Sequence, residues 1–143
     1  MEQTFNIQGY TVKVSRDNQE KAFVSRQLRF IDEVDATFYL PKADGTFIYH
    51  AEEGLLYLAE HYANLKALSF AAIGVEALKG GYWGKKLADN PQMDLVWAKV
   101  LSPPDEEELQ LELAFNDAAR DAYTLWITSF EGLLLKGTRR QAW

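Results

Sequence analysis

The chain opens with two short runs in which apolar and polar residues alternate. Residues 4–8 and residues 10–14 both follow this period of two, and Gly9 stands between them. Successive side chains of a β-strand point to opposite faces of the sheet. The pattern therefore predicts either two strands joined at Gly9 or one strand with a bulge at that glycine.

A signal for the start of a helix follows the second run. Asp17 suits the N-cap position and Glu20 the third helical position, a combination known as a capping box. One prediction for this segment is thus a short helix over about residues 18–31. The apolar residues between positions 23 and 31 fit a strand as well, so both interpretations stay open.

Residues 37–49 have the composition of a β-hairpin. Residues 37–40 and residues 46–49 are β-branched, aromatic or aliphatic, which is typical of strands. Asp44 and Gly45 lie between the two runs, and this pair strongly favours a turn. The segment is therefore predicted to form two antiparallel strands.

The longest periodic segment predicts one helix over about residues 52–79. Glu52 and Glu53 suit its first turn, because the helix dipole favours negative charge there. Gly74 would allow a break into two helices. Apolar residues recur every three or four positions and so share one face. They are Leu55, Leu58, Ala59, Tyr62 and Leu65.

Strand patterns dominate the last third of the chain. Residues 93–101 and residues 123–130 read as strands, the second being the clearest in the sequence. Residues 109–115 alternate strictly but also fit a helical period, and we favour the strand. Residues 133–136 form a last strand, and the basic end at residues 137–143 is expected to be loose.

These elements predict an α+β fold in a single domain over residues 1–143. A mainly antiparallel sheet of about five to seven strands is covered by the helix at residues 52–79, with the short helix at about 18–31 as an option. Trp126 is expected on the face of its strand opposite to its two neighbours. One shared core is expected from Phe5, Val12, Val14, Leu58, Tyr62, Leu65, Leu95, Trp97, Leu125 and Ile127.

Composition narrows the classes of function. The chain has 143 residues, no cysteine and a net charge of −6 that is shared evenly by its two halves. Disulfides, thiolate zinc sites and cysteine nucleophiles are therefore excluded, and sequence-independent binding to duplex DNA or anionic membranes is disfavoured. Neither a signal-peptide pattern nor an uninterrupted apolar span is present, so a cytoplasmic location is expected.

Residues with catalytic potential are few. His50 and Glu52 match half of the zinc deaminase signature, but the other half requires cysteines, so we reject that chemistry. His61 suits a helix surface, and the acidic residues 105–108 suit a solvated face better than a cation site. We predict no enzymatic activity, no metal site and no cofactor.

Residues 79–86 are the most informative segment for function. Three glycines make this a loop, and Tyr82 and Trp83 within it could form a contact surface flanked by lysines. The alternative is a packed turn whose aromatic rings fold back over the core.

Two functional interpretations remain. The first is a small acidic binding protein that occupies the surface of a partner protein, as inhibitors, immunity proteins and phage-encoded blockers of host defences do; its acidic charge suits a basic partner. The predicted contact residues are Tyr82, Trp83, Lys85, Lys86, Asp105, Glu106, Glu107, Glu108 and Trp143. The second is a single-stranded nucleic-acid-binding domain that uses the loop at residues 79–86. Its platform would also include Trp97, Lys99, Arg139, Arg140 and Trp143.

Overall fold

Eight strands and one long helix make up the part of the chain that the computed structural model describes. That part consists of residues 2–17, 22–25, 36–40, 48–80, 85, 93–101 and 109–143. The elements are β1 (Glu2–Ile7), β2 (Tyr10–Asp17), β3 (Ala22–Ser25), β4 (Thr37–Leu40), α2 (Ile48–Leu78), β5 (Asp94–Val100), β6 (Gln110–Asp117), β7 (Asp121–Glu131) and β8 (Leu134–Ala142).

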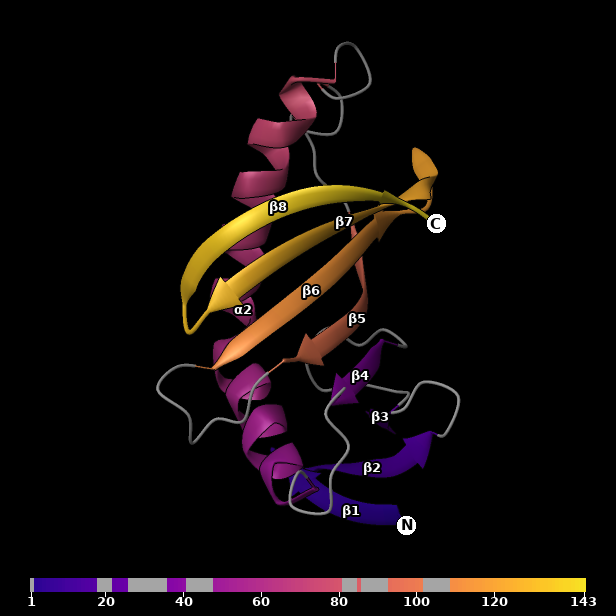
Figure 1. Ribbon diagram of the computed structural model, residues 1–143, viewed down its shortest axis with the longest axis vertical. Coiled ribbons are helices and arrows are strands. Elements are labelled where there is room, and N and C mark those ends of the chain that lie inside the picture. The colour runs from indigo at the N-terminus through magenta and orange to yellow at the C-terminus, as the bar shows by residue number, and fades with distance from the viewer. Residues whose placement is uncertain are drawn as a thin grey trace.

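The strands form one sheet in the order in which they occur along the chain (Figure 1). Every neighbouring pair is antiparallel except β4 and β5, which run parallel. The helix α2 packs against this mostly antiparallel sheet, so the predicted α+β class is confirmed.

β1 and β2 form a tight hairpin, which confirms the two-strand alternative for the start of the chain. Ile7 pairs with Tyr10, so only Gln8 and Gly9 lie in the loop. Both have positive φ angles, 51° and 88°. Positive φ at both loop residues is typical of two-residue hairpins, because such a turn matches the twist of the two strands. The Gly9 N–H donates a hydrogen bond of 3.1 Å to the side-chain oxygen of Asn6.

β3 corrects the prediction of a short helix at about residues 18–31. Residues 22–25 are a strand that pairs with both β2 and β4, which supports the strand alternative for this segment. The pairing on both sides outweighs the local helix signal at Asp17 and Glu20. The other residues of the predicted helix lie outside the described part.

The predicted hairpin at residues 37–49 is wrong. Its first half is the strand β4, which lies between β3 and β5. Ile48 and Tyr49 instead begin α2, and residues 41–47 lie outside the described part. Because β4 and β5 are parallel, a tight turn cannot join them, and α2 lies in the crossover between them.

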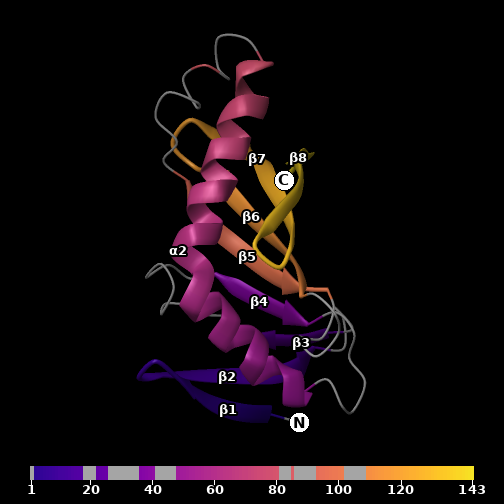
Figure 2. The ribbon, with the colours of Figure 1, turned by 90° about the vertical axis from the view of Figure 1, so that its left-hand side faces the viewer.

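The helix α2 spans the whole sheet. Its 31 residues correspond to a length of about 46 Å, whereas eight strands side by side extend over roughly 34 Å. Figure 2 shows α2 running along one face from β1 to β8, and in Figure 1 its last turns project past β8. The predicted helix at residues 52–79 is thus confirmed, with a start four residues earlier.

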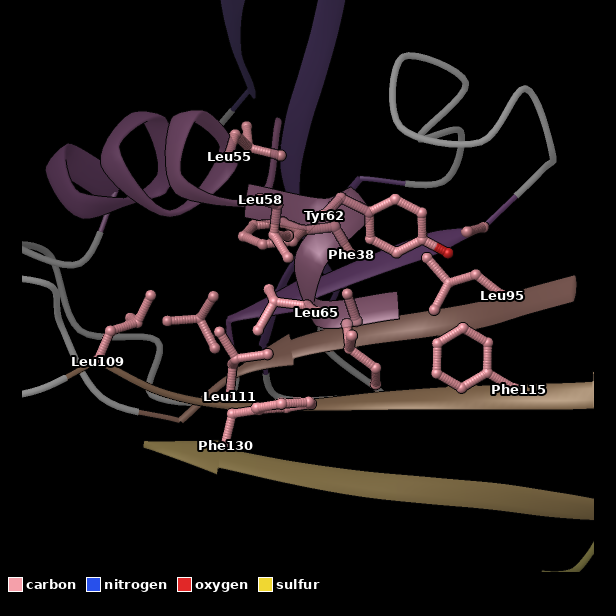
Figure 3. Close-up of a cluster of buried hydrophobic side chains, with 14 of the residues drawn as sticks. Phe38, Leu55, Leu58, Tyr62, Leu65, Leu95, Leu109, Leu111, Phe115 and Phe130 are labelled. Carbon is pink, nitrogen blue, oxygen red and sulfur yellow. The ribbon is translucent and has the colours of Figure 1, made fainter. Parts of the chain in front are cut away.

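The main core lies between α2 and the sheet. Figure 3 shows Leu58 and Leu65 pointing from the helix toward Leu111 and Phe130 of the strands. Leu111, Leu113 and Phe115 of β6 are all buried, which confirms the strand interpretation of residues 109–115. The helix lies close to the sheet at Gly54, where an added Cβ would lie 3.3 Å from Val100 Cγ2.

A second, smaller cluster of buried apolar residues corrects the predicted single core. It consists of Ala114, Leu125 and Ile127, with Val96 and Trp97 packed against it. Trp126 belongs to the main core instead. It therefore lies on the opposite face of β7 from Leu125 and Ile127, as predicted, but it is Trp126 and not these two residues that faces α2. A bulge between Leu95 and Trp97 turns Trp97 away from the face that Leu95 shares with the main core.

The remaining predicted core residues do meet in the main core. Val12, Val14, Leu58, Tyr62, Leu65 and Leu95 are buried there, and Phe5 packs against it.

The basic end of the chain is ordered as a strand, which corrects the expectation of a loose end at residues 137–143. β8 pairs with β7 from Leu134 to Ala142. Charged side chains such as Arg139 and Arg140 suit a strand at the edge of a sheet. Trp143 then donates its backbone N–H to the Tyr123 carbonyl at 2.9 Å.

Candidate interaction surfaces

Most of the contact residues predicted from the sequence lie outside the described part of the chain. These are Tyr82, Trp83, Lys86, Asp105, Glu106, Glu107 and Glu108. Lys85 is described and exposed. Trp143 is 60% exposed and lies beside the start of β7, where Tyr123 is 81% exposed. These two exposed aromatic residues are thus neighbours through their backbones at one corner of the sheet.

The side of α2 that faces away from the sheet carries an apolar surface. Between Glu60 and Lys79, every exposed residue of the helix is uncharged. Leu68 is 38%, Val75 59% and Leu78 56% exposed. We call this surface the outer face of α2. Its residues are Ala63, Asn64, Ala67, Leu68, Ala71, Val75 and Leu78.

A helix that covers a sheet usually presents charged and polar residues to solvent. α2 differs because its exposed outer face lacks charge as well. Its inner face is apolar in the usual way, with Leu65 and Ile73 fully buried. Lys66, the one charged residue between positions 62 and 75, is half-buried with its ammonium 5.5 Å from the centroid of the Phe70 ring. The helix is therefore apolar on two sides, which is typical of a helix buried by a further partner.

The sequence contained a signal for this surface that periodicity alone did not bring out. The apolar spacing of Leu55, Leu58, Tyr62 and Leu65 identifies the inner face, but it carries no information about the opposite face. A scarcity of charge over some eighteen helical residues is the signal that would have identified it.

Charged residues flank the outer face of α2 at its two ends. Glu52, Glu53 and Glu60 are exposed toward the N-terminal end, and Lys79 lies at the C-terminal end. Lys79 forms an ion pair of 3.1 Å with Glu76. The apolar strip thus has an acidic N-terminal end, whereas the charge of Lys79 at its C-terminal end is compensated by Glu76.

Tyr57 and His61 form a ring pair beside Glu60. Their ring centroids are 4.5 Å apart, and the His61 Nε2 lies 3.9 Å from a Glu60 carboxylate oxygen. Burial, with a further contribution from the charge of Glu60, raises the pKa of Tyr57 above its ordinary value of 10.0. Tyr57 is therefore neutral at physiological pH, and nothing in this arrangement prepares it as a general base.

The sheet face opposite α2 carries an aromatic and lysine cluster. The Lys99 ammonium lies 4.3 Å from the centroid of the Trp97 ring and 5.6 Å from that of Tyr39. Two residues predicted for a nucleic-acid platform, Trp97 and Lys99, are thus brought together. Arg139 is paired at 2.8 Å with Glu112. Arg140 points to the other face, over the Trp126 ring.

A pocket of about 180 Å³ lies where the end of α2 meets β7 and β8. Trp126, which is 4% exposed, contributes to its wall. The indole N–H of Trp126 is buried and has no hydrogen-bond acceptor among the described residues. We call this the α2–β8 pocket. Its lining residues are Glu76, Lys79, Gly80, Trp126, Thr138, Arg139 and Arg140.

The buried polar residues of the β6–β7 turn have structural partners. Asn116 donates to three backbone carbonyls, the shortest being that of Thr124 at 2.9 Å. Asp117, 2% exposed, accepts from the Arg120 Nε at 2.6 Å and from the Arg120 backbone N–H at 3.0 Å. These contacts close the turn.

The described residues contain no group of three or more His, Cys, Asp or Glu that could hold a metal ion. None of the helices among them has the length and apolar character needed to cross a membrane. The chain matches no family model, no curated protein and no solved structure.

Proposed function

We propose that this protein is a non-catalytic binding protein that acts by occupying the surface of a partner protein. The observation that carries the proposal is the outer face of α2, an exposed strip without charge between Glu60 and Lys79. Monomeric soluble proteins rarely leave a contiguous apolar surface uncovered unless it is a contact site. Inhibitors, immunity proteins and phage-encoded blockers of host defences act by occupying a partner's surface.

The spacing of the exposed residues supports contact along the helix axis. Leu68, Ala71, Val75 and Leu78 follow one another at intervals of three and four residues, so they form one line on the helix surface. Such lines are the anchors by which a helix binds in an apolar groove. The small side chain of Ala71 allows the partner's surface to approach closely between the larger anchors.

The larger anchors would supply most of the binding energy. Full burial of a Leu or Val side chain is worth roughly 1.5–3 kcal/mol, and Leu68, Val75 and Leu78 are each more than a third exposed in the free protein. Losing two of these anchors should therefore weaken binding by roughly a hundredfold.

The experiment has two steps. A photo-reactive amino acid replaces Val75 and, in a control protein, the exposed Leu134 of β8, and each protein is irradiated in a lysate of its native host. The captured partner is then purified, and its affinity is measured for wild type, for the double variant Leu68→Glu/Val75→Glu and for the control Leu134→Glu. Far-UV circular dichroism checks that each variant is folded.

We expect capture at position 75 and a roughly hundredfold loss of affinity in the double variant only. Unchanged affinity in the double variant would exclude the outer face of α2 as the contact surface. A cross-link between two copies of the chain would make the surface a homodimer interface and overturn the inhibitor-type proposal.

Binding to single-stranded nucleic acid is the second candidate, and the contact of Lys99 with Trp97 and Tyr39 favours it. Base stacking on an aromatic ring beside a cation is the usual basis of such binding. Against it, Lys99 already lies over the Trp97 ring, and the net charge of the chain is −6. Retention on heparin that falls steeply with salt would favour this candidate over a protein partner.

A further inference from the structure

One edge of β8 has no strand beside it in the described part of the chain. β8 ends the sheet and pairs with β7. The Trp143 backbone N–H donates to the Tyr123 carbonyl at 2.9 Å. In an antiparallel pair, residues that exchange backbone hydrogen bonds alternate with residues that do not. Followed back from Trp143 along the register, this alternation directs the backbone N–H and C=O groups of Thr138, Arg140 and Ala142 away from β7.

The outward backbone groups of β8 are accessible. We call residues 137–142 the open edge of β8, and all of them except Thr138 are exposed. A Cβ added to Gly137 would meet no atom within 4 Å, so nothing packs against the backbone there. Backbone donors and acceptors that are unpaired at a sheet edge are a template on which another chain can add a strand.

The last turns of α2 extend past this edge. The Ser69 hydroxyl lies 2.8 Å from the Thr128 hydroxyl, which places Ser69 over β7. From there α2 continues to Leu78, about 14 Å farther along its axis, whereas neighbouring strands lie only about 4.8 Å apart. Figure 1 shows the helix passing beyond β8. A strand added at the open edge of β8 would therefore lie beside the last turns of α2 as well.

The α2–β8 pocket lies between these turns and the open edge of β8. Glu76, Lys79 and Gly80 line it from the helix, and Thr138 and Arg140 line it from the strand. Its volume of about 180 Å³ leaves room for a side chain of an added strand. Domains that bind a segment by strand addition gain affinity from backbone hydrogen bonds and specificity from such side-chain pockets.

The open edge of β8 is positively charged. The segment from Leu134 to Trp143 contains Lys136, Arg139 and Arg140 and no acidic residue. Two copies of β8 that paired antiparallel and centred on this edge would bring their arginines next to one another, and like charges on facing strands are destabilising. The charge therefore disfavours a second copy of this chain, whereas a segment with acidic residues would meet opposite charges.

Arg140 is the cation best placed to recognise such a segment. Lys136 and Arg139 already form ion pairs with acids of neighbouring strands, at 3.5 Å and 2.8 Å. No such pair involves Arg140 among the described residues. Glu76, the acidic residue in the pocket lining, is held by Lys79 at 3.1 Å. An acidic residue opposite Arg140 would thus pair with an uncompensated charge.

We propose that the open edge of β8 binds an extended, acidic segment of a partner protein as a ninth strand of the sheet. The outward N–H and C=O groups of Thr138, Arg140 and Ala142 pair with the backbone of the segment, and Arg140 pairs with one of its carboxylates. This surface is separate from the outer face of α2, so its test is independent of the proposed function.

The first measurement uses the protein alone. Amide hydrogen exchange is followed residue by residue in isotope-labelled protein by NMR. The amides of Thr138, Arg140 and Ala142 should exchange at least roughly tenfold faster than those of Arg139 and Gln141, which face β7. Slow exchange at all five positions would show that another part of the chain already covers the edge, and it would overturn the proposal.

The second measurement adds a probe. The probe is the acetylated and amidated peptide Thr-Glu-Val-Glu-Val-Glu-Thr, and its control is the same peptide with lysine in place of each glutamate. The acidic peptide should bind saturably and should slow exchange at Thr138, Arg140 and Ala142, because strand addition gives these amides acceptors. The lysine peptide should bind at least roughly tenfold more weakly.

Two kinds of variant separate backbone pairing from charge. Thr138→Pro and Ala142→Pro each remove one outward N–H and no hydrogen bond to β7, so the melting temperature should stay nearly unchanged. Each should weaken binding of the acidic peptide roughly tenfold. Arg140→Gln should weaken it about threefold, and Lys13→Gln, which removes an exposed cation from β2, is the matched control and should leave it unchanged.

Four results would overturn the proposal. They are no binding of the acidic peptide at millimolar concentration, equal binding of the two peptides, binding that leaves exchange at the open edge of β8 unchanged, and binding that persists at full strength in both proline variants. Dimerisation of the free protein that Thr138→Pro abolishes would assign the edge to a second copy of the chain and would overturn the proposal as well.

Discussion

At the scale of single residues, Gln8 is a point of backbone strain. Gln8 has a φ of 51°, a left-handed conformation that side chains other than Gly, Asn and Asp adopt reluctantly. It is tolerated because the two-residue hairpin fixes the register of β1 on β2, and with it the buried positions of Ile7 and Val12. The strain at Gln8 is thus a local cost of placing the first strands correctly.

Replacing Gln8 by Asn should relieve this strain. Q8N creates the Asn-Gly pair that two-residue hairpins favour, so the free energy of unfolding should rise by about 0.5–1 kcal/mol. Chemical denaturation measures the change, and Thr11→Asn, at an exposed position of the neighbouring strand, is the control that should give no increase. A lower stability for Q8N would show that the Gln8 side chain makes a contribution that outweighs its backbone strain.

At the scale of elements, the close approach of α2 to the sheet depends on Gly54. A Cβ at this position would lie 3.3 Å from Val100 and 3.5 Å from Phe38, both in the main core. Glycine inside a helix lowers helix stability, so its presence here indicates that the space is needed for packing.

A large side chain at Gly54 should separate the helix from the sheet. Gly54→Leu is expected to lower the free energy of unfolding by about 1–3 kcal/mol, since overpacking forces the backbone or the neighbouring side chains to move. Ala63→Leu, on the exposed side of the same helix, is the matched control and should change stability little. Urea denaturation of both variants decides the question, and equal effects would mean that Gly54 is not a packing constraint.

The elements also differ in how far the local sequence pattern encodes them. The period of two identified β5, β6 and β7, and the period of the long helix identified the inner face of α2. Periodicity could not tell which face of β7 meets the helix, because Leu125, Trp126 and Ile127 are all apolar and all buried. The bulge after Leu95 and the crossover from β4 to β5 depend on long-range pairing, which local pattern does not encode.

The candidate sites could be predicted from the sequence less well than the fold could. The α2–β8 pocket joins residues from position 76 to position 140, and no motif marks that set. The outer face of α2 was visible as a shortage of charge, but a helix can be apolar for packing alone. Of the predicted contact residues, Lys85 and Trp143 are exposed, whereas the others lie outside the described part.

At the scale of the whole molecule, α2 is the element that holds the two halves of the sheet together. β1–β4 and β5–β8 meet at β4 and β5, which pair over only three residues on each strand. The helix crosses both halves (Figure 2). Leu55, in its N-terminal part, and Ile73, in its C-terminal part, are fully buried. Because the two halves share this helix, they should unfold together.

Ile7 gives a direct test of this cooperativity. It is fully buried in β1, whereas the described tryptophans, Trp97, Trp126 and Trp143, all lie in the other half or at its end. Ile7→Ala should lower the free energy of unfolding by about 2–5 kcal/mol. With Trp83 replaced by Phe in both proteins, so that the remaining tryptophans report β5–β8, the same shift of the urea midpoint should appear in tryptophan fluorescence and in circular dichroism at the helix band, which reports α2. If the fluorescence midpoint stayed at its wild-type value while the helix signal was lost earlier, the two halves would unfold separately, and α2 would not be the element that couples them.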